Sequence, residues 1–476
     1  MSIFEKIING LEVFGAFYMS IYVLVYFILG ILSFLALKKY YRSKYFLHKQ
    51  VLVKSNQAVG VSIVAPAFNE ATTIVQNVKS LLSQEYPKFE VVIINDGSTD
   101  DTLEKLITEF SLVRVNFFYQ EKIATQPVRG HYKSTDPVYS KLLVVDKENG
   151  GSKADGSNAG INSAKYNLFI CTDVDCILRK DTISTLVTPF IENTDKVIAT
   201  GGMIRISNAC EFKDGVLRQS HFPSNFFARF QELEYTRAFV FGRMAWTKIN
   251  SLLLVSGGLG MFHKETAIEA GGYWHKSMGE DMDLILRMRQ LMHRKKERFL
   301  IKYVPETLCW TEVPSTLSIF LRQRTRWGRG LIQTLYRHKK IMFSPKYGRT
   351  GSIAFPYFVF FEFIVPIMEV LGLLVLAVNV IYFQMELNHM LLVALTIYLF
   401  YGSITLLSVL VDQIFYKHYA SVGEMGSLIF TAFLEPFVYH PLNMIAFLRG
   451  YAHFLINRTQ KWGTMHRKGF DSLKEQ

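Results

Sequence analysis

The chain has 476 residues and a formal net charge of +13, and half of its residues are hydrophobic with 14% aromatic, an apolar content that argues for a membrane part. The positive charge suits an anionic membrane face, a nucleic acid or an anionic substrate, and charge alone does not choose among them. The four cysteines show neither CxxC spacing nor a matching histidine pattern, so we expect neither a zinc site nor a disulfide framework. We predict that the cysteines are reduced thiols in a cytosolic catalytic part.

The first predicted element is a membrane helix. Phe14 to Leu37 is an almost unbroken apolar run of about 24 residues, long enough to cross a bilayer. A basic cluster from Lys38 to Lys44 follows, and by the positive-inside rule this flank is cytoplasmic. The run lacks the basic start and small-residue cleavage site of a signal peptide, which leaves cleavage as the lesser alternative.

Two apolar strands are predicted next, Val61 to Pro66 and Phe89 to Asn95, with a helix pattern between them. Strand, helix and strand in this order predict a parallel sheet with crossover helices. The second strand stops at Asp96, where a carboxylate can accept hydrogen bonds from a base or ribose. The turn that Asp96 begins is also ordinary loop chemistry, so a structural role stays open.

A glycine-rich stretch, Gly150 to Gly160, comes after a long irregular segment. We expect Arg114 to Asp146 to be a surface excursion that returns to a strand at Leu142 to Val145. The glycine-rich stretch holds one lysine, Lys153, and opens a helix, and backbone amides with one ammonium suit a phosphate. It is no Walker A loop, and a helix cap with an unrelated lysine is the alternative.

Paired aspartates follow the next apolar run. Tyr166 to Cys171 predicts a short buried strand, so Asp173 and Asp175 emerge together at its carboxyl end, where open α/β sheets bind ligands. Two such carboxylates can share a divalent cation whose other positions go to water and phosphate oxygens, which suits a nucleoside diphosphate. In isolation, the same motif is more often a solvated turn.

Two further segments carry candidate chemistry. Leu252 to His263 contains three glycines, which allow a close approach of the backbone to a ligand. Glu280 and Asp281 open a helix pattern and are either caps or a base. Ser315 to His338 is a basic helix with interleaved aromatic residues, typical of a membrane interface and able to clamp a diphosphate.

The C-terminal part is strongly apolar. Ile353 to Phe383 and Met390 to Phe415 are both long enough to span a membrane. Leu428 to Leu448 is interrupted by two prolines, and a crossing there would put the basic tail outside. We therefore predict that this block is re-entrant or interfacial and that the tail is cytoplasmic.

These motifs, taken together, resemble those of membrane-embedded family 2 glycosyltransferases, similar to cellulose, chitin and hyaluronan synthases and bacterial poly-N-acetylglucosamine synthases. The resemblance covers about residues 60 to 330 and rests on Asn95-Asp96-Gly97-Ser98, Lys153, Thr172-Asp173-Val174-Asp175, Gly279-Glu280-Asp281 and Gln323-Arg324-Thr325-Arg326-Trp327. Gly279 stands where many relatives have threonine. A weaker match in the tail, Trp462-Gly463-Thr464 with Arg467, is similar to the gating loop of hyaluronan synthases.

The resemblance implies a GT-A fold, which is an α/β domain with a Rossmann-like mixed sheet, embedded between transmembrane helices. Asp96 would hold the uridine of a UDP-sugar and Lys153 would approach its diphosphate. Asp173 and Asp175 would contact the nucleotide and a Mg²⁺ or Mn²⁺ ion. The remaining implied site residues are the general base Asp281, the diphosphate and acceptor contacts Gln323, Arg326 and Trp327, and the lid residues Trp462 and Arg467.

The predicted organisation is that of a multi-pass inner-membrane protein with a cytoplasmic catalytic domain. Its predicted parts are a transmembrane helix in 1–45, the catalytic domain 46–314, interfacial helices 315–350, membrane helices 351–448 and a basic tail 449–476. The leading hypothesis is an inverting, processive β-glycosyltransferase that extends a polysaccharide from a UDP-sugar, with N-acetylglucosamine preferred. The rival is a single-transfer enzyme acting on a lipid or short acceptor.

The expected partners of the leading hypothesis are the UDP-sugar, the growing glycan and the bilayer, with export or accessory subunits left open. A non-catalytic membrane scaffold and a nucleic-acid-binding protein are the alternatives from other classes. The combined acidic and Gln-x-x-Arg-Trp motifs argue against a scaffold. The position of the basic residues beside apolar blocks argues against nucleic acid.

Overall fold

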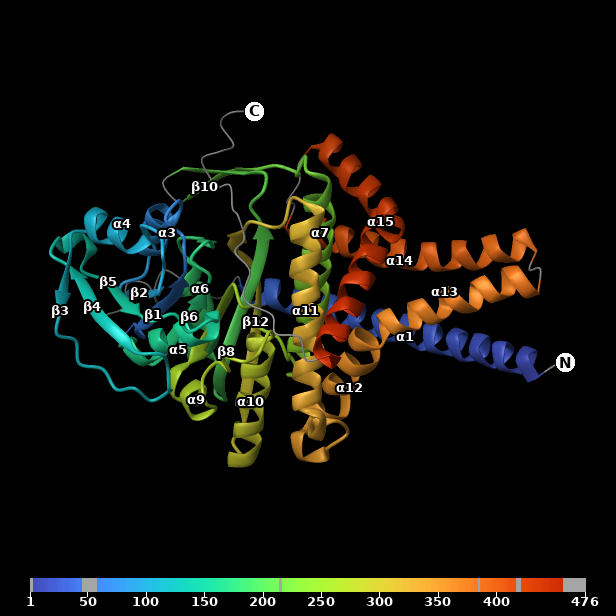
Figure 1. The fold of residues 1–476 in the computed structure, drawn as a ribbon, viewed down its shortest axis with the longest axis horizontal. Helices are drawn as coiled ribbons and strands as arrows, with labels where there is room; N and C mark the ends of the chain where they lie inside the picture. Colours follow the sequence, from blue (N-terminus) through green and yellow to red (C-terminus); the bar gives the residue numbers. More distant parts are fainter. Residues whose placement is uncertain (1–2, 45–57, 214–215, 384–385, 417–420, 457–476) are drawn as a thin grey trace. The chain divides into compact units, whose positions relative to one another are not determined.

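The computed structural model describes residues 3–44, 58–213, 216–383, 386–416 and 421–456. These residues form two compact units (Figure 1). The sheet unit comprises Tyr40–Pro223 and Asn250–Val313, and the helical unit comprises Met1–Lys39, Ser224–Ile249 and Pro314–Arg458.

A mixed sheet of ten strands organises the sheet unit, in the order β3-β4-β5-β2-β1-β6-β11-β8-β12-β7. Its strands are β1 (Val61–Ala67), β2 (Phe89–Asp96), β3 (Leu112–Val115), β4 (Val128–Ser134), β5 (Leu142–Lys147), β6 (Leu168–Thr172), β7 (Ile177–Leu178), β8 (Lys196–Ile206), β11 (Leu259–His263) and β12 (Phe299–Thr311). A separate hairpin joins β9 (Cys210–Lys213) to β10 (Val216–Ser220).

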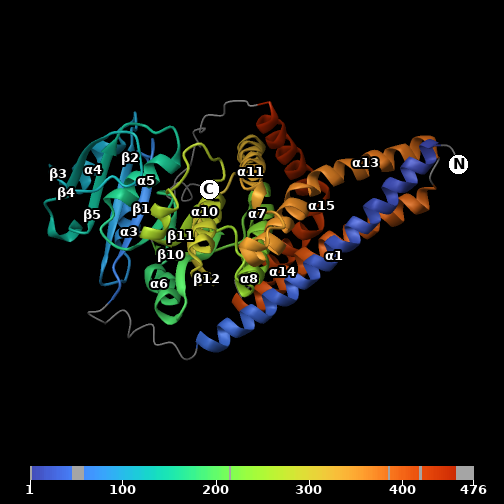
Figure 2. The ribbon, with the colours of Figure 1, turned by 90° about the horizontal axis from the view of Figure 1, so that it is seen from below.

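Helices surround this sheet in both views (Figures 1 and 2). They are α3 (Ile74–Leu82), α4 (Thr102–Glu109), α5 (Lys153–Ser163), α6 (Thr182–Glu192), α9 (Lys264–Glu269) and α10 (Glu280–Lys295). Helix α5 packs against β1 and β2. A Cβ atom at Gly160 would lie 2.4 Å from Val64 Cγ1 and 2.6 Å from Ile94 Cδ1, so this contact requires glycine.

Four parallel strands, β5, β2, β1 and β6, form the centre of the sheet. Their side chains are almost all buried, which explains why each strand is an apolar run rather than an alternating pattern. The predicted α/β sheet with crossover helices is confirmed. The four cysteines are buried free thiols, as predicted.

Strand β4 lies within the stretch 114–146, which the sequence analysis predicted to be an irregular excursion as far as residue 142, and that prediction was wrong. The strand pairs antiparallel with both β3 and β5. His131 is buried, whereas Arg129 and Lys133 are exposed. Because β4 is mostly polar and exposes one face, it has no apolar run by which the sequence could reveal it.

The helical unit contains eight of the α-helices described by the structure, long and short. They are α1 (Ile3–Lys44, through Lys39 in this unit), α7 (Phe226–Thr236), α8 (Arg243–Lys248), α11 (Leu317–Arg337), α12 (Phe355–Tyr357), α13 (Val365–Tyr382), α14 (Leu387–Tyr416) and α15 (Val422–Leu455). A π-helical segment, Arg237–Gly242, joins α7 to α8.

Residues 224–249 belong to the helical unit, although the sequence analysis assigned them to the catalytic domain 46–314. Phe230 of α7 packs with Phe320 of α11 and Tyr439 of α15 in one buried cluster. Its ring stacks on that of Tyr439 with centroids 5.4 Å apart. The sequence gives no sign of this insertion, because an amphipathic helix looks the same wherever it packs.

Among the residues that the structure describes, three helical stretches are long and apolar enough to cross a membrane, namely Ile3–Arg42, Thr350–Tyr382 and Tyr398–Tyr416. Helices α1 and α13 run side by side (Figures 1 and 2), and the side-chain amide of Asn379 in α13 donates to the Glu12 carboxylate in α1 at 2.6 Å. The predicted block 428–448 lies within α15, which continues through Pro436 and Pro441. The chain does not double back there, so the re-entrant alternative was wrong and the interfacial placement stays a prediction.

Candidate active site

The candidate site lies at one edge of the sheet, where the parallel strands β2, β5 and β6 end. Asp96 is the cross-strand partner of Lys147, and Asp173 directly follows β6. Strand β11 runs antiparallel to β6 with Leu259 opposite Thr172, so Gly257 and Gly258, just before β11, reach the same edge. The topology therefore gathers residues that are more than 150 positions apart in the sequence.

Asp96 is held by a buried lysine. The Nζ atom of Lys147, whose side chain is 0% exposed, lies 2.7 Å from Asp96 Oδ1 and 2.5 Å from Asp155 Oδ2. The Gly150 N–H also donates to Asp96 Oδ1 at 3.1 Å. Burial raises the pKa of Asp96 above its usual value, and Lys147 and the Gly150 N–H oppose that rise. Within the described residues these bonds go to Oδ1, which leaves Oδ2 to accept an N–H from a ligand.

The N-terminus of α5 supplies groups for a phosphate. Lys153 is its first residue, and Ser152 is the N-cap. The Ser152 hydroxyl is buried and has no hydrogen-bond partner among the described residues. Lys153 Nζ donates to the Gly257 carbonyl at 2.7 Å and lies 2.5 Å from Asp173 Oδ1. Burial would lower the pKa of Lys153, but Asp173 and other nearby acidic groups raise it above its usual value, so the lysine is a cation.

Asp173, Asp175 and Cys176 form a set of metal-ligand atoms that lie within 4.8 Å of one another. The Asp173 side chain is 40% exposed, and Asp175 is buried, so the pair extends from the interior to the surface. Hard divalent cations take carboxylate oxygens and keep other positions for water or phosphate. The residues present therefore fit a Mg²⁺ or Mn²⁺ ion held at Asp173 and Asp175.

Asp281 lies in the first turn of α10. Its Oδ2 atom accepts the Gly257 N–H at 3.0 Å, and its Oδ1 atom accepts the Met282 N–H at 2.8 Å. A Cβ atom at Gly257 would lie 3.5 Å from Asp281 Oδ2 and 3.8 Å from Lys153 Nζ. The carboxylate and the ammonium thus border the same small space beside Gly257.

The structure brings Lys153, Asp173, Asp175 and Asp281 to the same edge of the sheet as Asp96, and the roles expected of these residues stay predictions. Gln323, Arg326 and Trp327 lie on α11 in the helical unit. Trp462 and Arg467 lie outside the described residues.

The motif on α11 is anchored by Arg324, which is fully buried. Its guanidinium donates to both carboxylate oxygens of Glu234 at 2.5 and 2.6 Å and lies 4.0 Å from the ring centroid of Trp327. A bidentate ion pair and a stacked guanidinium fix the rotamer of both side chains. Arg324 therefore positions Trp327, and the Gln323 amide oxygen is buried without a hydrogen bond from the described residues.

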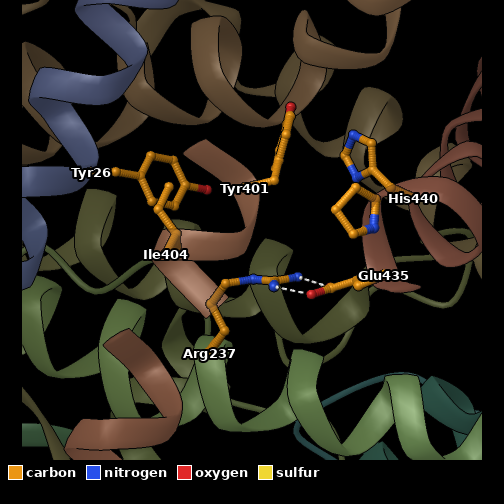
Figure 3. A pocket seen from close by; sticks show the side chains of 7 residues that line it. Tyr26, Arg237, Tyr401, Ile404, Glu435 and His440 are labelled. Atoms are coloured by element: carbon orange, nitrogen blue, oxygen red, sulfur yellow. Dashed lines mark hydrogen bonds and ion pairs between the residues drawn. The ribbon is translucent and has the colours of Figure 1, made fainter. Parts of the chain in front are cut away.

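The helical unit also holds a polar pocket, lined by Tyr26, Arg237, Tyr401, Ile404, Glu435, Pro436 and His440 (Figure 3). Arg237 points at Glu435 and donates to both of its carboxylate oxygens, at 3.1 and 2.9 Å. His440 lies 2.5 Å from Glu369, which also accepts from the Tyr401 hydroxyl at 3.0 Å. Ionisable groups beside apolar membrane stretches are generally functional.

The sequence analysis missed Lys147, Asp155, Ser152 and Cys176 as site residues. Lys147 is the last residue of β5, and its place in the site appears only when the register of the sheet puts it opposite Asp96. Cys176 was covered only by the general prediction of reduced thiols. Asp155 and Ser152 have no sequence signal beyond the helix start that they share with Lys153.

Comparisons with known proteins give family matches over the segments that hold this site. Residues 62–122 match the family described as "Glycosyl transferase family 2", and residues 134–330 match "Glycosyltransferase like family 2". The chain is 29% identical over 320 residues to a poly-beta-1,6-N-acetyl-D-glucosamine synthase of Staphylococcus epidermidis, a match that covers 67% of this chain and 65% of the relative. The corresponding Staphylococcus aureus synthase is 26% identical over 318 residues, with the same coverage.

Among solved structures, a mannosyltransferase of Pyrobaculum calidifontis matches with a TM-score of 0.47 and 15% identity, covering 90% of this chain and 100% of that one. The two family matches together cover more than half of the chain. They include every candidate residue of the sheet unit and none of the C-terminal tail. The chain belongs to glycosyltransferase family 2, and its mixed sheet is a GT-A-like fold.

Proposed function

We propose that the protein is an inverting, processive β-glycosyltransferase that uses UDP-N-acetylglucosamine to build a polysaccharide and pass it across the inner membrane. The observation that carries the proposal is the convergence of Lys153, Asp173 and Asp281 around Gly257 and Gly258. The staphylococcal relatives are synthases of poly-N-acetylglucosamine, which supports N-acetylglucosamine as the sugar.

Binding of the donor is proposed to use the surroundings of two lysines, Lys147 beside Asp96 and Lys153 beside Asp173. Asp96 Oδ2 accepts the imide N–H of uracil, an interaction that cytosine does not offer at the corresponding ring nitrogen. The diphosphate lies at the N-terminus of α5, where Ser152, Lys153 and the backbone amides meet it. A Mg²⁺ or Mn²⁺ ion at Asp173 and Asp175 would offset the charge of the diphosphate when bound.

The transfer is a single in-line displacement. Asp281 takes the proton of the acceptor hydroxyl as its oxygen bonds to the anomeric carbon, and the bond from that carbon to the UDP oxygen breaks. UDP keeps the electron pair of the broken bond, and Lys153 stabilises the charge that it gains. One carboxylate base suffices, because inversion needs no covalent intermediate on the protein.

The second part of the proposal is that the polysaccharide passes across the membrane through this protein. The three candidate spans and the basic flank after α1 support a multi-pass protein with the sheet unit in the cytoplasm. Gln323, Arg326 and Trp327 are proposed to contact the diphosphate and acceptor, and Trp462 and Arg467 to act as a lid. The polar pocket of Figure 3, with hydroxyl, carboxylate and aromatic groups, offers the partners that sugar hydroxyls need.

The direct test is turnover by purified protein in nanodiscs with Mg²⁺ or Mn²⁺ and a panel of labelled UDP-sugars, following UDP release and product length. Long polymer from UDP-N-acetylglucosamine alone is the expected result. Short or lipid-linked product would favour the single-transfer alternative. Absence of UDP release with every donor, with and without candidate accessory subunits, would refute the proposal.

Gly257→Ala is expected to raise the KM for the UDP-sugar while the fold stays intact. The added methyl group has ordinary contacts of 3.5 Å or more, but it occupies the space between Asp281 and Lys153. The Tm measured by intrinsic fluorescence should therefore change little, whereas UDP-sugar affinity falls. A variant with unchanged affinity would show that the sugar does not approach Gly257.

A further inference from the structure

We propose that Cys176 is a third ligand of the cation at Asp173 and Asp175, and that this thiol makes the site prefer Mn²⁺ and thiophilic ions such as Cd²⁺ to Mg²⁺. The inference rests on the proposed function only in that a divalent cation binds the paired aspartates. Binding would convert the Cys176 thiol into a metal-bound thiolate and release its proton to solvent.

The distances suit a shared ion. One ligand atom from each of Asp173, Asp175 and Cys176 lies within 4.8 Å of the others. Bonds of the lengths found at zinc, about 2.3 Å to sulfur and 2.0–2.2 Å to oxygen, place ligand atoms up to roughly 4.5 Å apart across an ion, so side-chain adjustments of a few tenths of an ångström suffice.

A turn of the backbone brings the thiol to the carboxylates. The Cys176 N–H donates to the Asp173 carbonyl at 3.1 Å, which closes a four-residue turn directly after β6. This turn is fixed from the other side, because the Thr172 hydroxyl donates to the Gly258 carbonyl at 2.8 Å. Cys176, three positions after Asp173, therefore lies on the same side of the turn as the aspartates.

Gly258 leaves open the space that these ligands face. A Cβ atom at Gly258 would lie 3.5 Å from Cys176 Sγ and 3.7 Å from Asp173 Oδ2. The thiol and the exposed carboxylate thus border one gap from two directions. The same Cβ position lies 3.3 Å from Ile204 Cδ1, so an apolar side chain, the thiol and the carboxylate all border this gap.

The chemistry of the thiol predicts the selectivity. Thiolate ligands select soft or borderline ions, and Mg²⁺ prefers oxygen ligands in a near-ideal octahedron. Cys176 is 0% exposed, so water does not compete for the sulfur. The two carboxylates alone would favour Mg²⁺, Mn²⁺ and Ca²⁺ by charge.

The test is titration of the full-length protein in detergent with Cd²⁺ and Co²⁺, observing sulfur-to-metal charge-transfer absorption, together with calorimetric affinities for Mn²⁺ and Mg²⁺. Wild type should show the charge-transfer band, and Cys176→Ser should lose it. The Cd²⁺ affinity of the variant should fall about tenfold or more, since even groups outside the ligand shell are commonly worth 10–100-fold. The ratio of Mn²⁺ to Mg²⁺ affinity should also fall.

Cys210→Ser is the matched control, because Cys210 is an equally buried thiol that donates to the Ile206 carbonyl and the Ser220 hydroxyl. It should keep the band and the affinities. A band that persists in Cys176→Ser, or that is missing from wild type, overturns the thiol ligand and leaves the proposed function standing. Asp175→Asn separates the thiol proposal from the proposed function. If this variant binds Mn²⁺ as tightly as wild type, the carboxylates do not hold the cation, and the proposed function loses the metal site on which it depends.

Discussion

Asp281→Asn should lower turnover by about 10²–10⁴-fold, the range associated with general-base catalysis, and leave UDP-sugar binding nearly unchanged. Both carboxylate oxygens of Asp281 accept one backbone N–H, from Gly257 and Met282. Bonds of this kind hold the carboxylate in place beside Gly257. Asparagine keeps the size of the side chain but cannot take a proton.

The measurement is single-turnover transfer together with calorimetric UDP binding. Glu280→Gln is the matched control, because Glu280 is the adjacent carboxylate in the same first turn of α10. If Glu280→Gln loses more turnover than Asp281→Asn, Glu280 is the base. Loss of UDP binding in Asp281→Asn would assign that residue to the nucleotide site or to structure.

The parallel core of the fold was predictable because its strands are buried on both faces. Such strands appear as continuous apolar runs, and the polar residues at the end of each run mark the edge of the sheet where ligands bind. Asp96 and Asp173 were found in this way before any contact was known. The resemblance to a family then supplied their roles.

Features that depend on pairing rather than on local pattern were not predictable. The antiparallel strand β11 places Gly257 and Gly258 beside Asp173. The residues of β11 alone predict neither its direction nor its pairing with β6. Lys147 reads as the end of an ordinary strand until the register puts it opposite Asp96. The four-residue turn that turns Cys176 toward the aspartates is likewise a property of the folded backbone.

Lys147→Met should destabilise the protein by about 3–5 kcal/mol at neutral pH, the penalty for leaving a buried charge without its partner. The substitution removes the ammonium that lies 2.7 Å from Asp96 and 2.5 Å from Asp155, and both carboxylates are at most 10% exposed. For a unit of this size the corresponding fall in Tm is roughly 6–20 °C. UDP affinity should fall in parallel, because Asp96 loses the contact that orients it.

Two controls separate this charge effect from a general loss of packing. Lys180→Met removes a lysine that is 45% exposed and 3.9 Å from Glu85, a surface pair worth about 0–1 kcal/mol. The double variant Lys147→Met with Asp155→Asn should regain stability relative to Lys147→Met alone, because it removes one of the two uncompensated carboxylates. If the second substitution lowers stability further, Lys147 acts through packing instead.

The pH dependence of Lys147→Met gives the sharper result. Burial raises the pKa of Asp96 in the folded chain above 3.8, the usual value, which holds for the unfolded chain. At a pH between the unfolded and the folded pKa, the folded chain binds more protons than the unfolded chain, so stability falls as pH rises. Lys147 opposes that rise, and its removal extends the window upward toward neutral pH. The Tm difference between wild type and variant should therefore be small near about pH 4 and widen up to about pH 7. A difference that is constant over this range would mean that Lys147 does not compensate an ionised Asp96.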